Sequence, residues 1–377
     1  ITLTASAVDV AGQAESYAAG SLTPAANPPG LRIRTAERGL YRLTYGDLQA
    51  AGVPLASANP AQFAVSYLGA PVDIEVTGAA DGRFDPGDLV IFYAEPYVGR
   101  YMAQNVYRFT WSGVTPARMA ARQVSAPPDW VPVSIIPQTI RFERDRSYYS
   151  TYDLPRDADH LFDDPLYANA AVPVAGTTYT LTLRYLAAAR TAQLRASFHG
   201  GAALDQAPDQ SVALRINNYD LGVHQWDGSV THLVKLNVPV AVLAEGANPL
   251  RLEAALAQLP GLTGYWVSPD WVELTYPAWA LAESNRLYVE GQWAGPAPSG
   301  PRVYLPLLFY RAAGAPAAQP IPFSAGGFTS AGVRVYDVRD ARRPVRLDGA
   351  AQTPAGATYE VQFLDGAGAG AAYFLAG

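Results

Sequence analysis

The chain has 377 residues, a length that favours two or three domains, and 49% of them are hydrophobic, which is enough to build packed cores. Its 27 basic and 33 acidic residues give a net charge of −6, and this diffuse acidity excludes binding to the phosphate backbone of nucleic acids. Cysteine is absent, which excludes thiol enzymes, disulfide scaffolds and cysteine-ligated zinc proteins. No stretch of 18 apolar residues occurs, so we expect no membrane span.

The first part of the chain reads as a lead-in followed by a β domain. Residues 1–30 are small, polar and contain prolines, and we expect a weakly ordered lead-in or one peripheral strand there. Residues 31–140 contain short alternating runs such as GLYRLTY, and period-two alternation is typical of a half-buried strand. The run GDLQAAG predicts one short helix with Gly52 as its stop.

A second β domain is expected over residues 141–284, and a small third β domain over residues 285–377. A long connection rich in proline and aspartate, at 127–170, precedes the central strands. These strands, for example THLVKLNVP, carry large apolar residues at alternate positions, with the spacing of a jelly-roll sandwich. We therefore predict an all-β chain of several antiparallel sandwiches with one or two short helices, in which the central domain is jelly-roll-like.

The densest cluster of acidic residues lies in the sequence AADGRFDPGDL, which contains Asp81, Asp85 and Asp88. Three carboxylates in so short a loop can donate the hard oxygen ligands that Ca²⁺ prefers, although their spacing does not match an EF-hand. The alternative is that these aspartates make Asx turns that reverse the chain before the next strand. Both interpretations are open at this point, and calcium is the one candidate cofactor.

Aromatic residues in the central domain carry a carbohydrate-binding hypothesis. Sugar rings bind to exposed flat aromatic side chains that have amide or carboxylate neighbours. We expect Trp226, in the turn HQWDGS, to be exposed, and we name Tyr219 and Asp227 as its partners. The alternative is that these aromatic residues, together with Trp266 and Trp271 of the last central strand, fill the core.

No catalytic arrangement is visible in the sequence. The chain lacks a G-x-S-x-G elbow and a G-K-[ST] phosphate loop, and no spacing of Asp and Glu identifies an acid and a nucleophile. The four histidines form no recognised metal motif. We therefore expect a chain that acts by binding and is not itself an enzyme.

Several segments, in order, resemble one family. They are GLYRLTYGDLQAAGVPL, PAQFAVSYLGAPVDIEV, DGRFDPGDLVIFYAE, NVYRFTW and, near residues 328–347, FTSAGVRVYDVRDARRPVRL. This pattern is similar to the region that precedes the catalytic domain in gingipain-like cysteine peptidases, a group that includes the sortase-like protein of a bacterial secretion system. The family's Cys and His nucleophile pair has no counterpart in this cysteine-free chain, so no catalytic residue is carried over.

The resemblance implies an exported or cell-surface bacterial protein whose partner is a peptidase domain that follows in the same precursor. This chain would be the accessory or pro-region, which assists folding, positions the enzyme or blocks its cleft. An exposed stretch with Arg141, Arg144 and Arg146 could enter a cleft that prefers basic side chains; the alternative is a charged linker that contacts nothing. A carbohydrate-binding or purely structural surface module is the competing interpretation.

Overall fold

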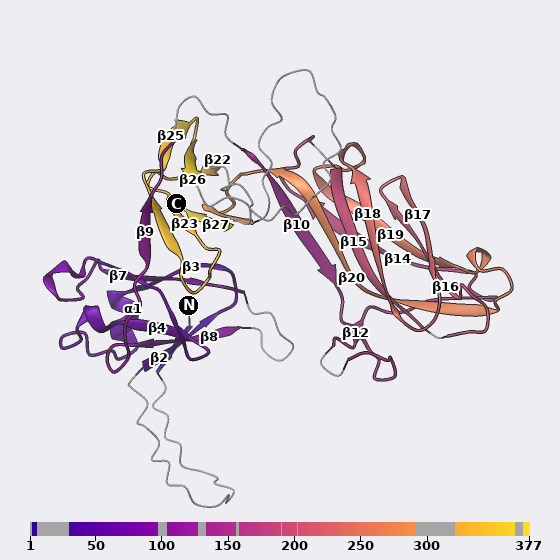
Figure 1. The fold of residues 1–377 in the computed structure, drawn as a ribbon, viewed down its shortest axis with the longest axis horizontal. Coiled ribbons are helices and arrows are strands. Elements are labelled where there is room, and N and C mark those ends of the chain that lie inside the picture. The colour runs from indigo at the N-terminus through magenta and orange to yellow at the C-terminus, as the bar shows by residue number, and fades with distance from the viewer. Residues whose placement is uncertain are drawn as a thin grey trace, which may run out of the picture. The chain divides into compact units, whose positions relative to one another are not determined.

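The computed structural model of the chain describes residues 2–5, 30–96, 104–126, 133–155, 158–189, 191–201, 203–290, 321–365 and 372–377. The chain divides into two compact units: unit 1 combines Ile1–Pro132 with Ala282–Gly377, and unit 2 is Val133–Leu281. Strands dominate both units, as Figure 1 shows, and the predicted all-β antiparallel fold class is confirmed.

The division differs from the three consecutive domains that the sequence indicated. The segment from Ala282 onward belongs to the same compact unit as the N-terminal segment. A boundary at residue 140 would also cut a strand, Ile135–Glu143, which lies in the region expected to be a connection. Of the expected lead-in, residues 2–5 form a strand, Gly30 begins the next strand, and the rest lies outside the described residues.

The first segment of unit 1 contains short strands, one short α-helix and two 3₁₀ turns (η). They are β1 (Thr2–Ala5), β2 (Gly30–Thr35), β3 (Gly39–Thr44), α1 (Tyr45–Ala50), η1 (Pro60–Gln62), β4 (Ala64–Tyr67), β5 (Ala70–Val72), β6 (Glu75–Thr77), η2 (Ala79–Asp81), β7 (Leu89–Ala94), β8 (Asn105–Thr110) and β9 (Ala120–Gln123). The second segment adds β21 (Arg286–Glu290), β22 (Ile321–Phe328), β23 (Arg334–Asp337), β24 (Val345–Asp348), β25 (Ala351–Ala355), β26 (Thr358–Asp365) and β27 (Ala372–Ala376).

The described strands of unit 1 form four sheets. Two are built from the first segment alone, in the orders β1-β2-β8-β4-β5 and β3-β7-β6. One, β22-β26-β25, is built from the second segment alone. The remaining sheet, β21-β27-β23-β24-β9, joins the two segments, because β9 pairs in parallel with β24.

The predicted helix is confirmed as α1, and its ends follow from local chemistry. Thr44 is the N-cap and makes a reciprocal capping box with Asp47, so backbone donors at the helix start are satisfied. Leu48 is the buried residue of the helix and packs into a core with Phe63, Phe92 and other apolar residues from the first-segment strands. This core covers the inner face of the β1-β2-β8-β4-β5 sheet.

A second core joins the two segments of unit 1. Tyr93 of β7 packs with Tyr336, Val338, Ala372 and Phe374, all of which come from the second segment. The rings of Tyr93 and Phe374 meet edge to face with centroids 5.9 Å apart. Figure 1 shows the yellow C-terminal strands beside purple strands of the first segment.

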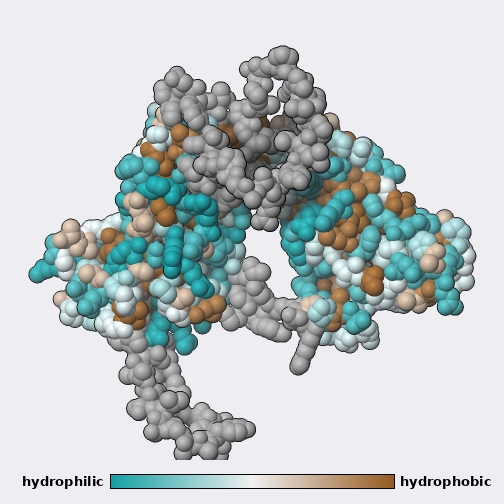
Figure 2. Space-filling view, in the orientation of Figure 1, coloured by the Kyte–Doolittle hydropathy of each residue, from teal (hydrophilic) through white to brown (hydrophobic). Residues whose placement is uncertain are grey.

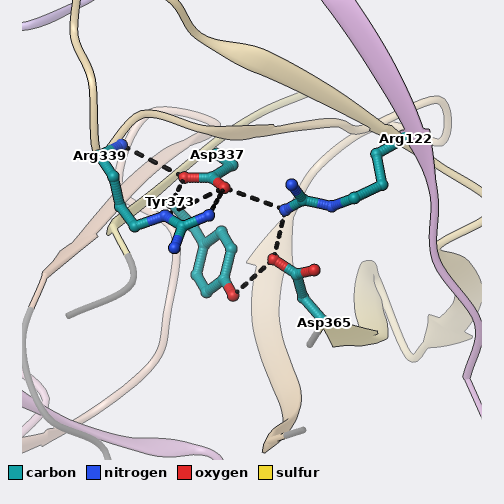
Figure 3. A network of polar contacts seen from close by, with 5 residues as sticks. All are labelled: Arg122, Asp337, Arg339, Asp365 and Tyr373. Carbon is teal, nitrogen blue, oxygen red and sulfur yellow. Dashed lines mark hydrogen bonds and ion pairs between the residues drawn. The ribbon is translucent and has the colours of Figure 1, made fainter. Parts of the chain in front are cut away.

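A buried ion network, defined here as Arg122, Asp337, Arg339, Asp365 and Tyr373, connects the same two segments (Figure 3). Arg122 Nη2 of β9 donates to Asp337 Oδ2 at 2.9 Å and to Asp365 Oδ2 at 2.6 Å, and both carboxylates are almost fully buried. Burial alone would raise the pKa of Asp337, but hydrogen bonds from Arg339 and Arg122 outweigh burial and lower this pKa. The network therefore holds the Asp337 carboxylate in its ionised form inside the junction.

Unit 2 is folded from one continuous stretch. Its elements are β10 (Ile135–Glu143), β11 (Ser147–Tyr148), β12 (Leu161–Phe162), β13 (Leu166–Asn169), β14 (Val174–Leu183), β15 (Thr191–Gly200), β16 (Gln210–Ile216), β17 (Tyr219–Trp226), β18 (Thr231–Pro239), η3 (Val240–Val242), β19 (Gly246–Ala255), η4 (Leu256–Gln258) and β20 (Gly264–Trp279).

Eight long strands of unit 2 form two four-stranded sheets, β10-β20-β15-β18 and β14-β19-β16-β17, with β13 added beside β20. The jelly-roll-like prediction requires two such antiparallel sheets. Their inner faces carry the apolar residues of each alternating strand, and the rings of Phe142 and Tyr179 stack between β10 and β14 at 4.4 Å. The outer faces are left for polar side chains.

Candidate functional site

The aspartate-rich loop of unit 1 forms a network of turns. Asp81 accepts a hydrogen bond from the Arg83 amide at 3.0 Å, and Asp88 accepts one from the Asp85 amide at 2.8 Å. The first contact is an Asx turn, and the second links Asp88 back to an amide three residues earlier, so both help to reverse the chain before the next strand. The part of the chain that the structure describes contains no group of three His, Asp or Glu side chains that could hold a metal ion. Calcium binding at this loop stays a prediction.

The expected exposure of Trp226 is wrong. Its side chain is only 8% exposed, because Trp226 ends β17 at a position paired with the fully buried Gln210. Its ring stacks on His232 at 4.6 Å with an interplanar angle of 3°, and Phe198 lies 6.3 Å away. The turn that follows Trp226 is exposed, but the indole faces the interior of the sandwich.

The other two residues named for sugar binding do not gather around a common site with Trp226. Tyr219 is 40% exposed but begins β17, whereas Trp226 ends it, so about 20 Å of strand separates them. Asp227 is exposed in the turn after β17. The two aromatic residues therefore lie at opposite ends of one strand and cannot contact the same sugar ring.

The arginine-rich stretch is neither a free loop nor a linker without contacts. Arg141 lies in β10, where its guanidinium donates to Glu143 at 2.8 Å and to Glu273 at 2.9 Å. Arg144 and Arg146 each form an ion pair with the buried Asp163, at 3.7 Å and 3.6 Å. These ion pairs attach the stretch to unit 2.

The outer face of the β10-β20-β15-β18 sheet is the best-organised polar surface of unit 2. We call it the ladder face and define it by Arg141, Glu273, Arg195, Trp271 and Asp270. Glu273 of β20 lies between the two arginines and also accepts from Arg195 of β15 at 3.0 Å. Cation and anion alternate across three strands, so these charges largely neutralise one another.

The ring of Trp271 packs against both arginines of the ladder face. The guanidinium carbon of Arg141 lies 4.5 Å from the centre of its ring and that of Arg195 lies 5.4 Å from it. The ring of Trp271 is therefore covered by cationic groups and does not present an uncovered aromatic face on which a sugar ring could stack. The sequence named Trp271 as a binding candidate, but it could not show that two arginines from neighbouring strands occupy its face.

A β-bulge places Asp270 beside this face. The register between β15 and β20 shifts between Ala196 and Phe198, which leaves Ser197 outside the regular ladder. Burial raises the pKa of Asp270 to about 6, against the opposing effect of a hydrogen bond with Ser197. The nearby Glu143 contributes to this raised pKa, so Asp270 can exchange a proton near pH 6.

A bare aromatic surface exists elsewhere in unit 2. Tyr167 of β13 is 49% exposed and pairs across the strands with Trp266 of β20. Their rings meet edge to face at 6.1 Å, and Trp266 lies directly over Gly201, where a Cβ would come within 2.0 Å of the indole nitrogen. Sequence reasoning named Trp266 but missed Tyr167. Figure 2 shows polar side chains over most of the visible surface, with separate apolar patches on unit 2.

The sequence matches no described protein family and no curated protein. The fold is similar to that in the crystal structure of dimeric latent PorU from Porphyromonas gingivalis, with a TM-score of 0.61, 14% identity and coverage of 92% of this chain. This chain spans 32% of the length of that PorU chain, so the likeness is to part of it. It shows a related all-β fold.

Two carbohydrate-binding modules are also similar over about a third of this chain. One is the CBM36-1 domain of a multidomain xylanase from the hindgut metagenome of Trinervitermes trinervoides, with a TM-score of 0.24, 12% identity and coverage of 37% of this chain and 94% of the module. The other is CBM36 in complex with calcium and xylotriose, with a TM-score of 0.23, 18% identity and coverage of 36% and 98%. TM-scores this low carry no functional argument.

No helix in the described parts of the chain is long and apolar enough to cross a membrane.

Proposed function

We propose that this chain is the non-catalytic accessory region of an exported, gingipain-like peptidase, and that it acts by binding and positioning the peptidase domain. The observation that carries this proposal is the fold similarity to PorU over 92% of the chain, together with the ordered sequence segments that resemble the region preceding the peptidase domain. An extracellular or cell-surface location follows from the same proposal.

The architecture of unit 1 suits a positioning role. Strand β27 lies between β21 and β23 and is hydrogen-bonded on both sides. Phe374 of β27 is buried against Tyr93 of the first segment, and Tyr373 donates to Asp365 of the buried ion network at 3.0 Å. A peptidase domain joined after this strand would be held by a rigid element, which is how a scaffold fixes the orientation of its neighbour.

The test is a binding and activity measurement with the two parts produced separately. The purified chain is titrated onto the peptidase domain encoded after it, and association is followed by calorimetry while peptide hydrolysis is assayed. Association with unchanged hydrolysis supports positioning, and association with reduced hydrolysis supports inhibition by the accessory region. A coding sequence without a caspase-like domain, or two parts that do not associate, would overturn the proposal.

A carbohydrate-binding module is the second candidate function. The observation that favours it is the Tyr167–Trp266 pair, in which the half-exposed ring of Tyr167 packs edge to face against the ring of Trp266. Glycan-array binding that is lost in Tyr167→Ala and kept in Tyr219→Ala would support this function. Tyr219 is a matched control because it is also exposed but lies on another strand. A silent array, or equal loss in both variants, would remove it.

A further inference from the structure

His199 of β15 lies on the outer face of its sheet and is nevertheless completely buried. Its neighbour Phe198 faces the interior, where its ring lies 6.3 Å from that of Trp226, so strand alternation turns His199 to the opposite side. There His199 is paired with Ser268 of β20 and with Thr231 of β18. The exposed fraction of His199 is 0%. A side chain on the outer face of a sheet reaches this value only where another segment covers it.

The segment that covers the imidazole is the arm, which we define as residues 147–154. The ring of Tyr152 stacks on the imidazole, with centroids 4.0 Å apart and an interplanar angle of 25°. The Tyr152 hydroxyl shares a hydrogen bond of 2.8 Å with Ser268 Oγ. Tyr149 stacks on Tyr152 at 4.7 Å, and Phe162 of β12 contributes a further ring 5.8 Å from the imidazole. The contact between the arm and the sheet is therefore centred on the side chain of one histidine.

Hydroxyl groups are the hydrogen-bond partners of both ring nitrogens of His199. Ser229 Oγ donates to the Gly200 carbonyl oxygen at 3.0 Å, so it offers a lone pair to His199 Nε2, which lies 3.4 Å away. Thr231 Oγ1 lies 3.2 Å from Nδ1 and can donate to it. These contacts fit a neutral imidazole with its proton on Nε2. No carboxylate in the described parts of the chain forms a hydrogen bond or an ion pair with His199.

A proton on this imidazole would be a buried cation without an anionic partner. From the described segments around it, His199 is faced by Tyr152 of the arm, Phe162 of β12, Ser268 of β20 and Thr231 of β18, none of which is charged at neutral pH. The attraction of a cation to the face of the Tyr152 ring returns only part of the lost hydration, and burial lowers the pKa of His199. A proton therefore binds more tightly when the arm is lifted and the imidazole is in contact with water.

We propose that His199 is an acid-sensitive latch, and that protonation of its imidazole in mildly acidic solution releases the arm from the outer face of β15 and β20. Because the imidazole is on the outer face, water reaches it when the arm moves, and the apolar layer between the two sheets stays closed. On its other side the arm is held by the β11–β12 ladder, which is only two residues long on each strand. The latch lies within unit 2 and requires neither a peptidase domain nor a sugar.

Two carboxylates of unit 2 titrate with the opposite sign. Burial raises the pKa of Asp145, and the nearby carboxylates of Glu143 and Asp159 raise it as well. Burial also raises the pKa of Asp270, to about 6. These two groups bind protons more tightly in the folded arrangement, so acid favours it through them while acid opposes it through His199. The latch is therefore measured as the difference between the wild type and a variant that lacks the imidazole.

The test is amide hydrogen exchange of the full chain, followed by mass spectrometry of peptides that cover the arm. Its amides include that of Tyr149, which donates to the His160 carbonyl oxygen at 3.0 Å and is protected while the arm is closed. Exchange is recorded from pH 7 to pH 5 and corrected for the intrinsic rate at each pH. We expect the protection of the arm to fall about tenfold over this range, because the open form takes up a proton near the ordinary pKa of histidine and the closed form at a lower one.

Two variants separate the latch from other titrating groups. His199→Phe keeps a ring under Tyr152 but cannot be protonated, and the protection of its arm should change less than about twofold over the same range. His160→Gln removes a half-buried histidine that is bonded to the Tyr149 carbonyl oxygen, and it should keep the wild-type pH dependence. If His199→Phe does not keep the wild-type melting temperature at pH 7, His199→Gln replaces it. Equal pH dependence in the wild type and the His199 variant, or a loss of protection that spreads over all of unit 2 at once, would overturn the proposal.

Discussion

Unit 2 is folded from one continuous stretch of chain, whereas unit 1 joins two stretches that are separated by the whole of unit 2. The two units also differ in where their paired charged groups lie. In unit 2 the arginine–glutamate ladder lies on the outer face of one sheet, and the buried Asp163 is paired within the same continuous stretch, with Arg144 and Arg146. In unit 1 the ion network is buried at the junction between the two stretches. A buried carboxylate that loses its partner is left as an uncompensated charge, so the network stabilises this particular pairing of distant strands.

The largest expected effect is the loss of a buried carboxylate at the junction. Asp337→Ala leaves Arg122 and Arg339 without a shared acceptor and should lower the free energy of unfolding of unit 1 by about 3–5 kcal/mol. The check is calorimetry of the full chain, in which the unit 1 transition moves and the unit 2 transition does not. Asp348→Ala, which removes a partly exposed partner of Arg346, is the control and should cost less than about 1 kcal/mol. Similar shifts for both variants would contradict the role of the junction.

The next largest loss of stability is expected from truncating a buried side chain in unit 2. Trp226→Ala removes a buried ring from between His232 and Phe198, and we expect a loss of about 3 kcal/mol in the stability of unit 2 alone. Chemical denaturation followed by tryptophan fluorescence and circular dichroism measures it. Tyr219→Ala, at the exposed start of the same strand, should change stability by less than about 0.5 kcal/mol. A harmless Trp226→Ala would restore the expectation of an exposed indole.

The two units should respond to acid with opposite signs at two of their carboxylates. The pKa of Asp270 is raised to about 6, so over the window of about pH 4 to 6 the folded state binds a proton that the unfolded state does not. The contribution of Asp270 to the stability of unit 2 therefore falls as pH rises through this window. The pKa of Asp337 is lowered, so its contribution to unit 1 is constant there and is lost only below about pH 4.

The variant Asp270→Asn isolates this effect. Burial lowers the pKa values of His199 and His232, which acts against Asp270, so the difference between wild type and variant is the quantity to measure. We expect Asp270→Asn to gain stability relative to wild type as pH rises from 4 to 6, in melting temperatures recorded across that range. A difference that is flat with pH would show that Asp270 has an ordinary pKa.

A partly exposed pair of contacts on the ladder face gives a smaller effect. Glu273→Gln removes the anion between Arg141 and Arg195 and should cost less than about 1 kcal/mol, because these pairs are partly exposed. Arg141 keeps its second partner, Glu143, in this variant. Chemical denaturation followed by circular dichroism measures the change, with Thr275→Ala on the same face as the control. A loss as large as that of Asp337→Ala would contradict the contrast between partly exposed and buried ion pairs.

Calcium should have the smallest effect. Asp81 and Asp88 already accept hydrogen bonds from backbone amides of their own loop, so we expect calorimetric titration to give no heat and no change in melting temperature. Heat that disappears in Asp85→Asn would instead support the calcium interpretation of this loop.

Local patterns predicted the elements well where neighbours in sequence decide them. The alternation in GLYRLTY and the capping residue Thr44 together define β3 and α1, because strand periodicity and capping act within a few residues. The region before the central strands was misjudged, since the proline and charges of IIPQTIRFE concealed β10. Proline at position 137 is tolerated because β10 lies at the edge of its sheet.

The amino acids alone were sufficient for the all-β class, the short helix and the absence of thiol chemistry. They did not reveal that β9 pairs with β24, that Trp226 is covered by His232, or that Arg32 faces Arg108. Each of these depends on how strands are placed in the packed unit: β9 and β24 are far apart in sequence, as are Arg32 and Arg108, and Trp226 meets His232 only because β17 and β18 lie in the two facing sheets. Periodicity and turn chemistry act over a few residues, whereas the partner of a strand is chosen by the energy of the whole packed unit.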